Sequence, residues 1–108
     1  MQSKGGKNAM QDEFIRKIGV YGQMHYRYLK ETKPSVVNIM RMKGTLRRYL
    51  EEVDANAEEM LFQLVKQMAK SEGVTESLKR QDQLVWVQRM NSIRDRAFEI
   101  VSKEIICN

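Results

Sequence analysis

The stretch that decides the fold is LRRYLEEVDANAEEMLFQL, residues 46–64. Its apolar side chains recur at alternating steps of four and three residues, which is the spacing of a heptad repeat. Such a pattern is typical of a long α-helix that buries one narrow stripe of its surface against another helix. The stretch therefore predicts a long helix and a second helix that packs against its apolar stripe. The stripe consists of Leu46, Leu50, Val53, Ala57, Met60 and Leu64.

A second stripe with the same spacing follows near the C-terminus. Between the two stripes, Gly73 suits the residue just after a helix, and Thr75 suits the N-cap of the next one. Two long helices joined by a short loop are expected to fold back as an antiparallel hairpin. The second stripe consists of Trp86, Met90, Ile93, Ala97 and Ile100, and Ile105 continues it.

The hairpin predicts which residues face one another. A turn centred on residues 73–74 would place residue i opposite roughly residue 147 − i, so that residues 60–65 face residues 84–87. Both segments are apolar over more than a two-helix seam can bury. We expect the N-terminal helices to cover part of this surface and a second copy to cover the rest in a homodimer. The interface candidates are Phe62, Val65, Leu84, Trp86 and Val87.

Two shorter helices are expected before the hairpin. The first spans about residues 12–30, but Gly19 and Gly22 lie inside it and each costs up to about 1 kcal/mol relative to alanine, so the helix is expected to start late or to break there. The second begins at Pro34, whose ring preorganises a first helical turn, and Gly44 ends it near Lys43.

These patterns define the expected architecture. The chain is all-α, a small helical bundle built on a long antiparallel helical hairpin with two shorter N-terminal helices. Residues 1–11 are polar and are expected to form a flexible tail, and residues 12–108 are expected to form a single helical domain. No apolar run approaches the roughly 20 residues that span a bilayer. The lone cysteine, Cys107, cannot form an internal disulfide, and a cytoplasmic location is expected.

The net charge of +5 is unevenly distributed along the chain. Residues 27–48 contain seven cations and one anion, and Tyr26, Tyr28 and Tyr49 lie within or directly beside this segment, a composition that suits contact with a nucleic acid. Five anions follow immediately, however, at spacings that allow ion pairs with the preceding arginines, so these side chains can equally form a solvated helix surface. The nucleic-acid-binding candidates are Arg27, Lys30, Lys33, Arg41, Lys43, Arg47 and Arg48.

The sequence contains no pattern typical of a catalytic or cofactor site. His25 is the only histidine, and no nucleophile motif accompanies it, so we interpret it as a packing or surface residue. One histidine and one cysteine do not provide the ligands of a zinc site, and no glycine-rich phosphate loop is present. We expect no enzymatic activity, no cofactor and no bound metal.

From residue 20 onward the chain resembles the TnpV family, small proteins encoded on bacterial transposons and related mobile elements. The resemblance rests on YGQMHYRYLKETKP, GTLRRYLEEVDANAEEM, LVKQMAKSEGVTESLK and WVQRMNSIRDRAFEIV, followed by EII. The sequence departs from the family pattern in residues 38–43, where Arg41 and Lys43 add charge. The resemblance implies a bacterial cytosolic accessory protein and supplies no reaction and no functional residues.

Two hypotheses of function follow. In the first, the protein is a helical interaction module that regulates or assists transposition by binding another protein through the apolar surface around Phe62 and Trp86. In the second, it is a basic helical protein that binds DNA or RNA through the seven cations.

Overall fold

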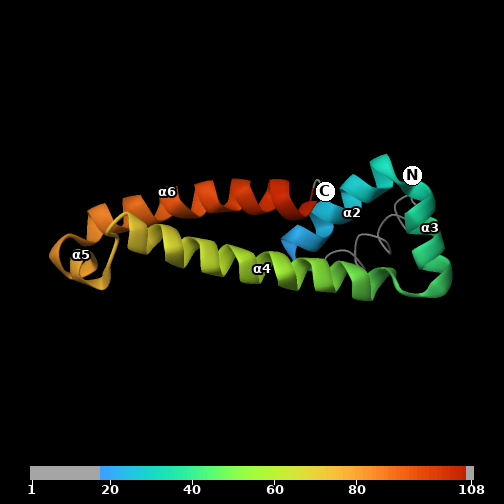
Figure 1. The fold of residues 1–108 in the computed structure, drawn as a ribbon, viewed down its shortest axis with the longest axis horizontal. Coiled ribbons are helices and arrows are strands. Elements are labelled where there is room, and N and C mark those ends of the chain that lie inside the picture. Colours follow the sequence, from blue (N-terminus) through green and yellow to red (C-terminus); the bar gives the residue numbers. More distant parts are fainter. Residues whose placement is uncertain (1–17, 107–108) are drawn as a thin grey trace, which may run out of the picture. The chain divides into compact units, whose positions relative to one another are not determined.

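The computed structural model describes residues 18–106, and every element in this range is helical (Figure 1). This confirms the predicted all-α class. The predicted tail, the first residues of the predicted first helix and Cys107 lie outside the described residues. The elements are α2 (Val20–Thr32), α3 (Pro34–Lys43), α4 (Leu46–Ser71), α5 (Glu76–Gln81), α6 (Gln83–Val101) and a final π-helical turn, η1 (Ser102–Ile106).

The described chain divides into two compact units. The N-terminal unit consists of residues 18–56 and the C-terminal unit of residues 57–106, so that the long helix α4 passes from one into the other. The expected single domain over residues 12–108 stays a prediction, and so does the hairpin over the full length of both long helices.

Two glycines end helices as the sequence predicts. Gly44 after α3 and Gly73 after α4 both have a φ of 71°, the left-handed conformation that glycine adopts without a steric penalty. At each of them the following residue donates a hydrogen bond back across the last turn, from Thr45 N to Met40 O at 2.9 Å and from Val74 N to Ala69 O at 2.8 Å. This pattern is a Schellman motif, and it satisfies carbonyl groups that the helix end leaves without partners.

The N-terminal unit has a core formed by α2, α3 and the first part of α4. Leu46 and Leu50, the first two residues of the predicted stripe, are both buried there, and Leu50 has no exposed surface. The partly buried side chains of Tyr28 and Met40 pack against this core. The buried members of the core are Ile18, Tyr26, Leu29, Val37, Leu46 and Leu50.

The beginning of α2 is held by Asp54 of α4. Its Oδ1 accepts hydrogen bonds from the backbone N–H groups of Tyr21 and Gly22, each at 3.0 Å, in the first turn of the helix. A Cβ on Gly19 would collide with the Asp54 carboxylate, and a Cβ on Gly22 would lie 2.8 Å from Leu50 O. The two glycines allow this close approach, and α2 begins directly after Gly19 and continues through Gly22 unbroken.

The C-terminal unit has a second core in which α4, α5 and α6 meet. Val74, Met90 and Ile93 are buried, and Met90 and Ile93 belong to the second predicted stripe. Side chains from all three helices pack against them and complete the cluster. These partly buried side chains are Val65, Met68, Ala69, Leu78 and Trp86.

The connection between α4 and α6 is longer than predicted. Thr75 caps a helix as expected, accepting from Leu78 N at 3.3 Å, but this helix, α5, ends after six residues. Asp82 then caps α6 by accepting from Val85 N at 3.2 Å. The Asp82 cap satisfies a backbone donor that a continuous helix would have bonded to the carbonyl of residue 81, and the backbone leaves helical geometry at Asp82, with φ −150° and ψ 89°.

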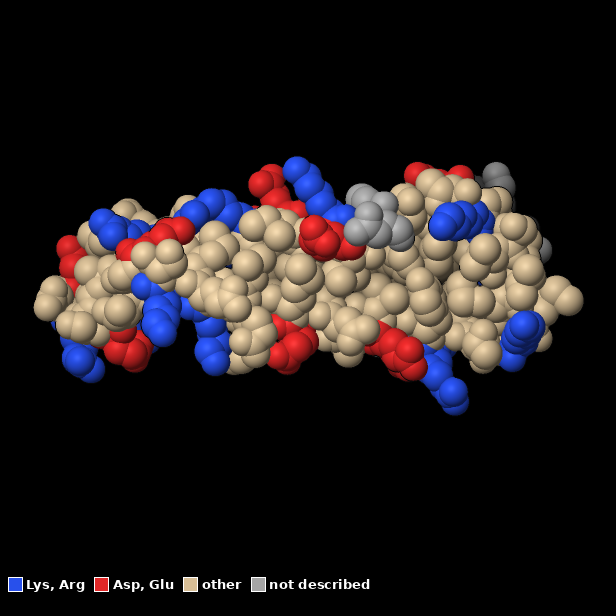
Figure 2. Space-filling view, viewed as in Figure 1, with Lys and Arg blue, Asp and Glu red and all other residues tan. Residues whose placement is uncertain are grey.

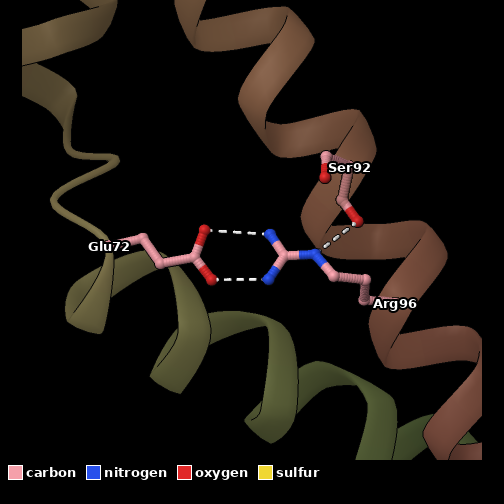
Figure 3. A network of polar contacts seen from close by, with 3 residues as sticks. All are labelled: Glu72, Ser92 and Arg96. Carbon is pink, nitrogen blue, oxygen red and sulfur yellow. Dashed lines mark hydrogen bonds and ion pairs between the residues drawn. The ribbon is translucent and has the colours of Figure 1, made fainter.

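This extra helix changes which residues meet. Arg96 of α6 donates two hydrogen bonds to the Glu72 carboxylate, from Nη1 at 2.7 Å and Nη2 at 2.9 Å, and its Nε donates to Ser92 O at 3.3 Å (Figure 3). A turn centred on residues 73–74 would have placed Glu72 beside the residues directly after the turn. The predicted pairing of residues 60–65 with residues 84–87 is therefore wrong, because α5 lengthens the connection.

Candidate functional site

An open groove of about 530 Å³ lies in the C-terminal unit, between α4 and α6. Four of the side chains that line it are apolar and four are charged, which is a composition suited to binding an amphipathic partner surface. Its lining side chains are Glu58, Leu61, Phe62, Val65 and Lys66 of α4 with Arg94, Asp95 and Phe98 of α6.

Two phenylalanines give the groove an exposed apolar surface. Phe62 is 57% exposed and Phe98 is 39% exposed, although neither side chain carries a polar atom that would favour contact with water. The Nζ of Lys66, one helical turn after Phe62, lies 5.0 Å from the centroid of the Phe62 ring. Large exposed apolar side chains that gather in a groove mark a site of protein interaction more often than scattered ones do.

An exposed stripe on α6 extends from the groove. Leu84, Val87, Asn91, Arg94 and Phe98 are all exposed and recur at steps of three and four residues, so they lie along one side of the helix. Leu84 is 67% exposed and Val87 is 38% exposed. The stripe runs beside the buried one that contains Met90 and Ile93.

The five predicted interface residues therefore separate into three groups. Phe62 and Val65 line the groove, and Leu84 and Val87 lie on the exposed stripe of α6. Trp86 packs against the core of the C-terminal unit, with Lys79 Nζ 4.6 Å from its ring centroid. Sequence reasoning missed Phe98, although its heptad spacing from Leu84 and Val87 was a signal for it.

Two of the seven predicted basic residues converge in the N-terminal unit. The Nζ of Lys30 on α2 lies 4.8 Å from the centroid of the Tyr26 ring, and the guanidinium carbon of Arg41 on α3 lies 5.8 Å from it. Arg41 also donates a hydrogen bond to the Tyr26 hydroxyl. Tyr26 is only 3% exposed, so its ring serves the core and cannot stack on a nucleic-acid base.

The other basic candidates are spread over the three helices, apart from Lys33, which lies between α2 and α3. Arg47 forms the predicted pair with Glu51, with Nε 3.2 Å from Oε2, and Arg27, Lys33, Lys43 and Arg48 are exposed. On the face shown in Figure 2, Lys and Arg side chains form separate groups, with carboxylates and uncharged surface between them. The pairing of Arg47 agrees with the solvated-surface interpretation for that residue.

His25 lies inside the N-terminal unit. It is 3% exposed, its Nε2 is 2.7 Å from the Tyr49 hydroxyl oxygen, and its ring stacks on Tyr28 with the centroids 6.1 Å apart. Burial raises the pKa of Tyr49. The burial of His25 and its contacts with Tyr28 and Tyr49 are those of a packing residue, one of the two roles proposed for this histidine. Among residues 18–106, no three His, Cys, Asp or Glu side chains lie close enough together to hold a metal ion.

The chain belongs to a family of transposon proteins. The sequence profile of the family described as "Transposon-encoded protein TnpV" matches residues 8–106, which confirms the resemblance found in the sequence. No curated protein and no solved structure matches the chain. Between residues 18 and 106, no helix combines the length and the apolar character needed to cross a bilayer.

Proposed function

We propose that this TnpV-family protein is a non-enzymatic accessory or regulatory protein of a bacterial mobile element and acts in the cytoplasm by binding another protein chain. Membership of the family supports the link to a mobile element. The observation that carries the mode of action is the groove, where Phe62 and Phe98 remain exposed beside four charged side chains.

The proposal includes an antiparallel hairpin of α4 and α6 as the scaffold of the groove. The contacts that support it lie in the C-terminal unit, where Met68 and Ala69 of α4 pack against the cluster that contains Met90 and Ile93 of α6. Phe62 and Phe98 line the same groove farther along both helices, Phe62 toward the start of α4 and Phe98 toward the end of α6. In a hairpin the two helices form one rigid binding face, which lowers the entropy lost on association.

Titration of the purified protein with the other proteins encoded by the same element tests this function. The Phe62→Ser variant should weaken binding to one of them at least about tenfold, since exposed aromatic anchors dominate interface energies. Ile39→Ser is the matched control, because Ile39 is 50% exposed but lies on α3, in the other unit. Equal affinities for wild type and Phe62→Ser would contradict the proposal.

A second candidate function is binding to DNA or RNA. The observation that favours it is the convergence of Lys30 and Arg41 beside Tyr26, which places two cations from different helices close together. Contact with phosphates predicts a complex whose affinity falls steeply between low and moderate salt and weakens in the Lys30→Gln and Arg41→Gln variants. A gel-shift titration at two salt concentrations makes the measurement. No binding to single-stranded or duplex nucleic acid at low salt would exclude this function.

A further inference from the structure

Three groove residues of α4 follow one another at four-residue steps. They are Glu58, Phe62 and Lys66, and all three are exposed. Residues four apart lie on the same side of a helix, about 6 Å apart along its axis. One anion and one cation therefore lie at equal distances on either side of an exposed aromatic ring.

This arrangement is complementary to itself. A two-fold axis perpendicular to α4 at Phe62 brings the α4 helices of two chains together in antiparallel directions. Because Glu58 and Lys66 are equidistant from Phe62, the axis places Glu58 of each copy level with Lys66 of the other. Two Glu58–Lys66 ion pairs form between the copies, one on each side of the paired Phe62 rings.

The α6 side of the groove follows the same symmetry. In the proposed hairpin, Phe98 lies across the groove from Phe62, so two Phe98 rings also meet near the two-fold axis. Arg94 lies one turn before Phe98, at the Lys66 end of the groove, and Asp95 lies beside it. The Lys66 end therefore carries a net positive charge among the lining residues, and Glu58 of a second copy is attracted to it.

We infer that a second copy of this chain occupies the groove, face to face, with Phe62 at the two-fold axis and two flanking Glu58–Lys66 pairs. This rests on one part of the proposed function, that the groove binds a protein chain, and it names a second copy as a chain that binds there. The joined grooves form one cluster of four phenylalanine rings, and aromatic pairs of this kind add to the stabilisation that burial of their apolar area provides. The charged side chains set the antiparallel direction of the two α4 helices.

A charge-swap experiment on the full chain tests the inference. In the Glu58→Lys variant, each copy presents two lysines, and in the Lys66→Glu variant each presents two glutamates, so both homodimers contain two like-charge contacts. Sedimentation over a concentration series should show each variant dissociating at least about tenfold more readily than wild type. An equimolar mixture of the two variants restores both attractive pairs, and it should form a heterodimer within about threefold of the wild-type affinity.

The controls change the net charge equally outside the groove. Glu99→Lys matches Glu58→Lys, and Lys103→Glu matches Lys66→Glu, and neither position lines the groove. Both controls should dimerise like wild type. Circular dichroism of every variant establishes that its helices are intact before its association is compared.

Two outcomes would overturn the inference. One is a wild-type chain that remains monomeric at millimolar concentration, and the other is a heterodimer no tighter than the two single variants. Neither would affect the proposed function, which is tested by loss of binding to another protein of the element in the Phe62→Ser variant. If the charge-swap variants behave as expected but the chain binds no other protein of the element, the wider function is refuted and the inferred dimer is not.

Discussion

Two aromatic pairs, one in each unit of the chain, differ in their exposure to solvent. In the N-terminal unit Tyr21 and Tyr26 are only 2% and 3% exposed, and the hydroxyl of Tyr26 accepts a hydrogen bond from Arg41. In the C-terminal unit Phe62 and Phe98 lie in an open groove and are 57% and 39% exposed. Aromatic burial in the first unit stabilises the fold, whereas the exposed rings of the second are suited to recognition. Substitutions in the two units should therefore have different consequences.

The largest expected effect is on the core of the N-terminal unit. Leu50 has no exposed surface, and Leu50→Ala should lower the free energy of unfolding by about 2–5 kcal/mol through the lost burial and the cavity left behind. Leu84→Ala makes the same chemical change at a position that is 67% exposed, and it should cost less than about 0.5 kcal/mol. Urea denaturation followed by circular dichroism measures both. Similar losses in the free energy of unfolding at the two positions would contradict the difference in burial between Leu50 and Leu84.

Gly22 in α2 provides a test in which the sign of the change in stability decides the outcome. In an open helix, Gly22→Ala would stabilise by up to about 1 kcal/mol. Here the new Cβ would collide with Ile18 and lie 2.8 Å from Leu50 O, so the substitution should destabilise by about 1–3 kcal/mol. Thermal unfolding gives the sign directly. A raised melting temperature would mean that α2 does not approach α4 as closely as described.

Asp54, whose cap on α2 is partly buried, should contribute more to stability than Asp82, whose cap on α6 is exposed. Asp54→Ala removes the acceptor of two backbone N–H groups and should cost about 1–2 kcal/mol. Asp82→Ala removes the acceptor of one, at the exposed start of α6, and should cost about 0.5–1 kcal/mol. Chemical denaturation measures the loss in the free energy of unfolding for each variant. A larger loss for Asp82→Ala than for Asp54→Ala would contradict the assigned role of Asp54.

The smallest effect is expected at the exposed pair in the C-terminal unit. The hydrogen bonds from Arg96 lower the pKa of Glu72 below its ordinary value of 4.5. A carboxylate whose pKa is lowered by folding contributes stability above that ordinary value and loses it as the pH falls through its folded pKa. Wild type should exceed Glu72→Gln in stability at neutral pH, and the difference should vanish in strong acid. Because the pair is exposed, the difference should be small. Glu76→Gln is the control, and a difference that persists in acid would contradict the role of the ion pair.

Much of the fold could be predicted from local patterns. The two apolar stripes identified Leu46, Leu50, Met90 and Ile93 as core residues, and Gly44 and Gly73 marked helix ends because the left-handed conformation favours glycine. These signals act within a few residues, so the sequence displays them directly.

Contacts between distant residues could not be predicted in the same way. Asp54 caps a helix that begins more than thirty positions earlier, and the sequence shows only one carboxylate within an acidic run. Asp82 gives a cap signal, but it interrupts a segment that otherwise suits a continuous helix. This unrecognised cap lengthens the connection between the two long helices, and it hid from sequence analysis that Phe62 and Phe98 line one groove.

The central claim is that recognition belongs to the groove and that the basic side chains near Tyr26 are not required for it. The most direct test measures the transposition frequency of the element in cells that lack the native protein and are complemented with variants. Phe62→Ser and Phe98→Ser should each give the frequency of uncomplemented cells, whereas Lys30→Gln and Arg41→Gln should match wild type. The opposite result, with active groove variants and inactive basic-residue variants, would contradict the account.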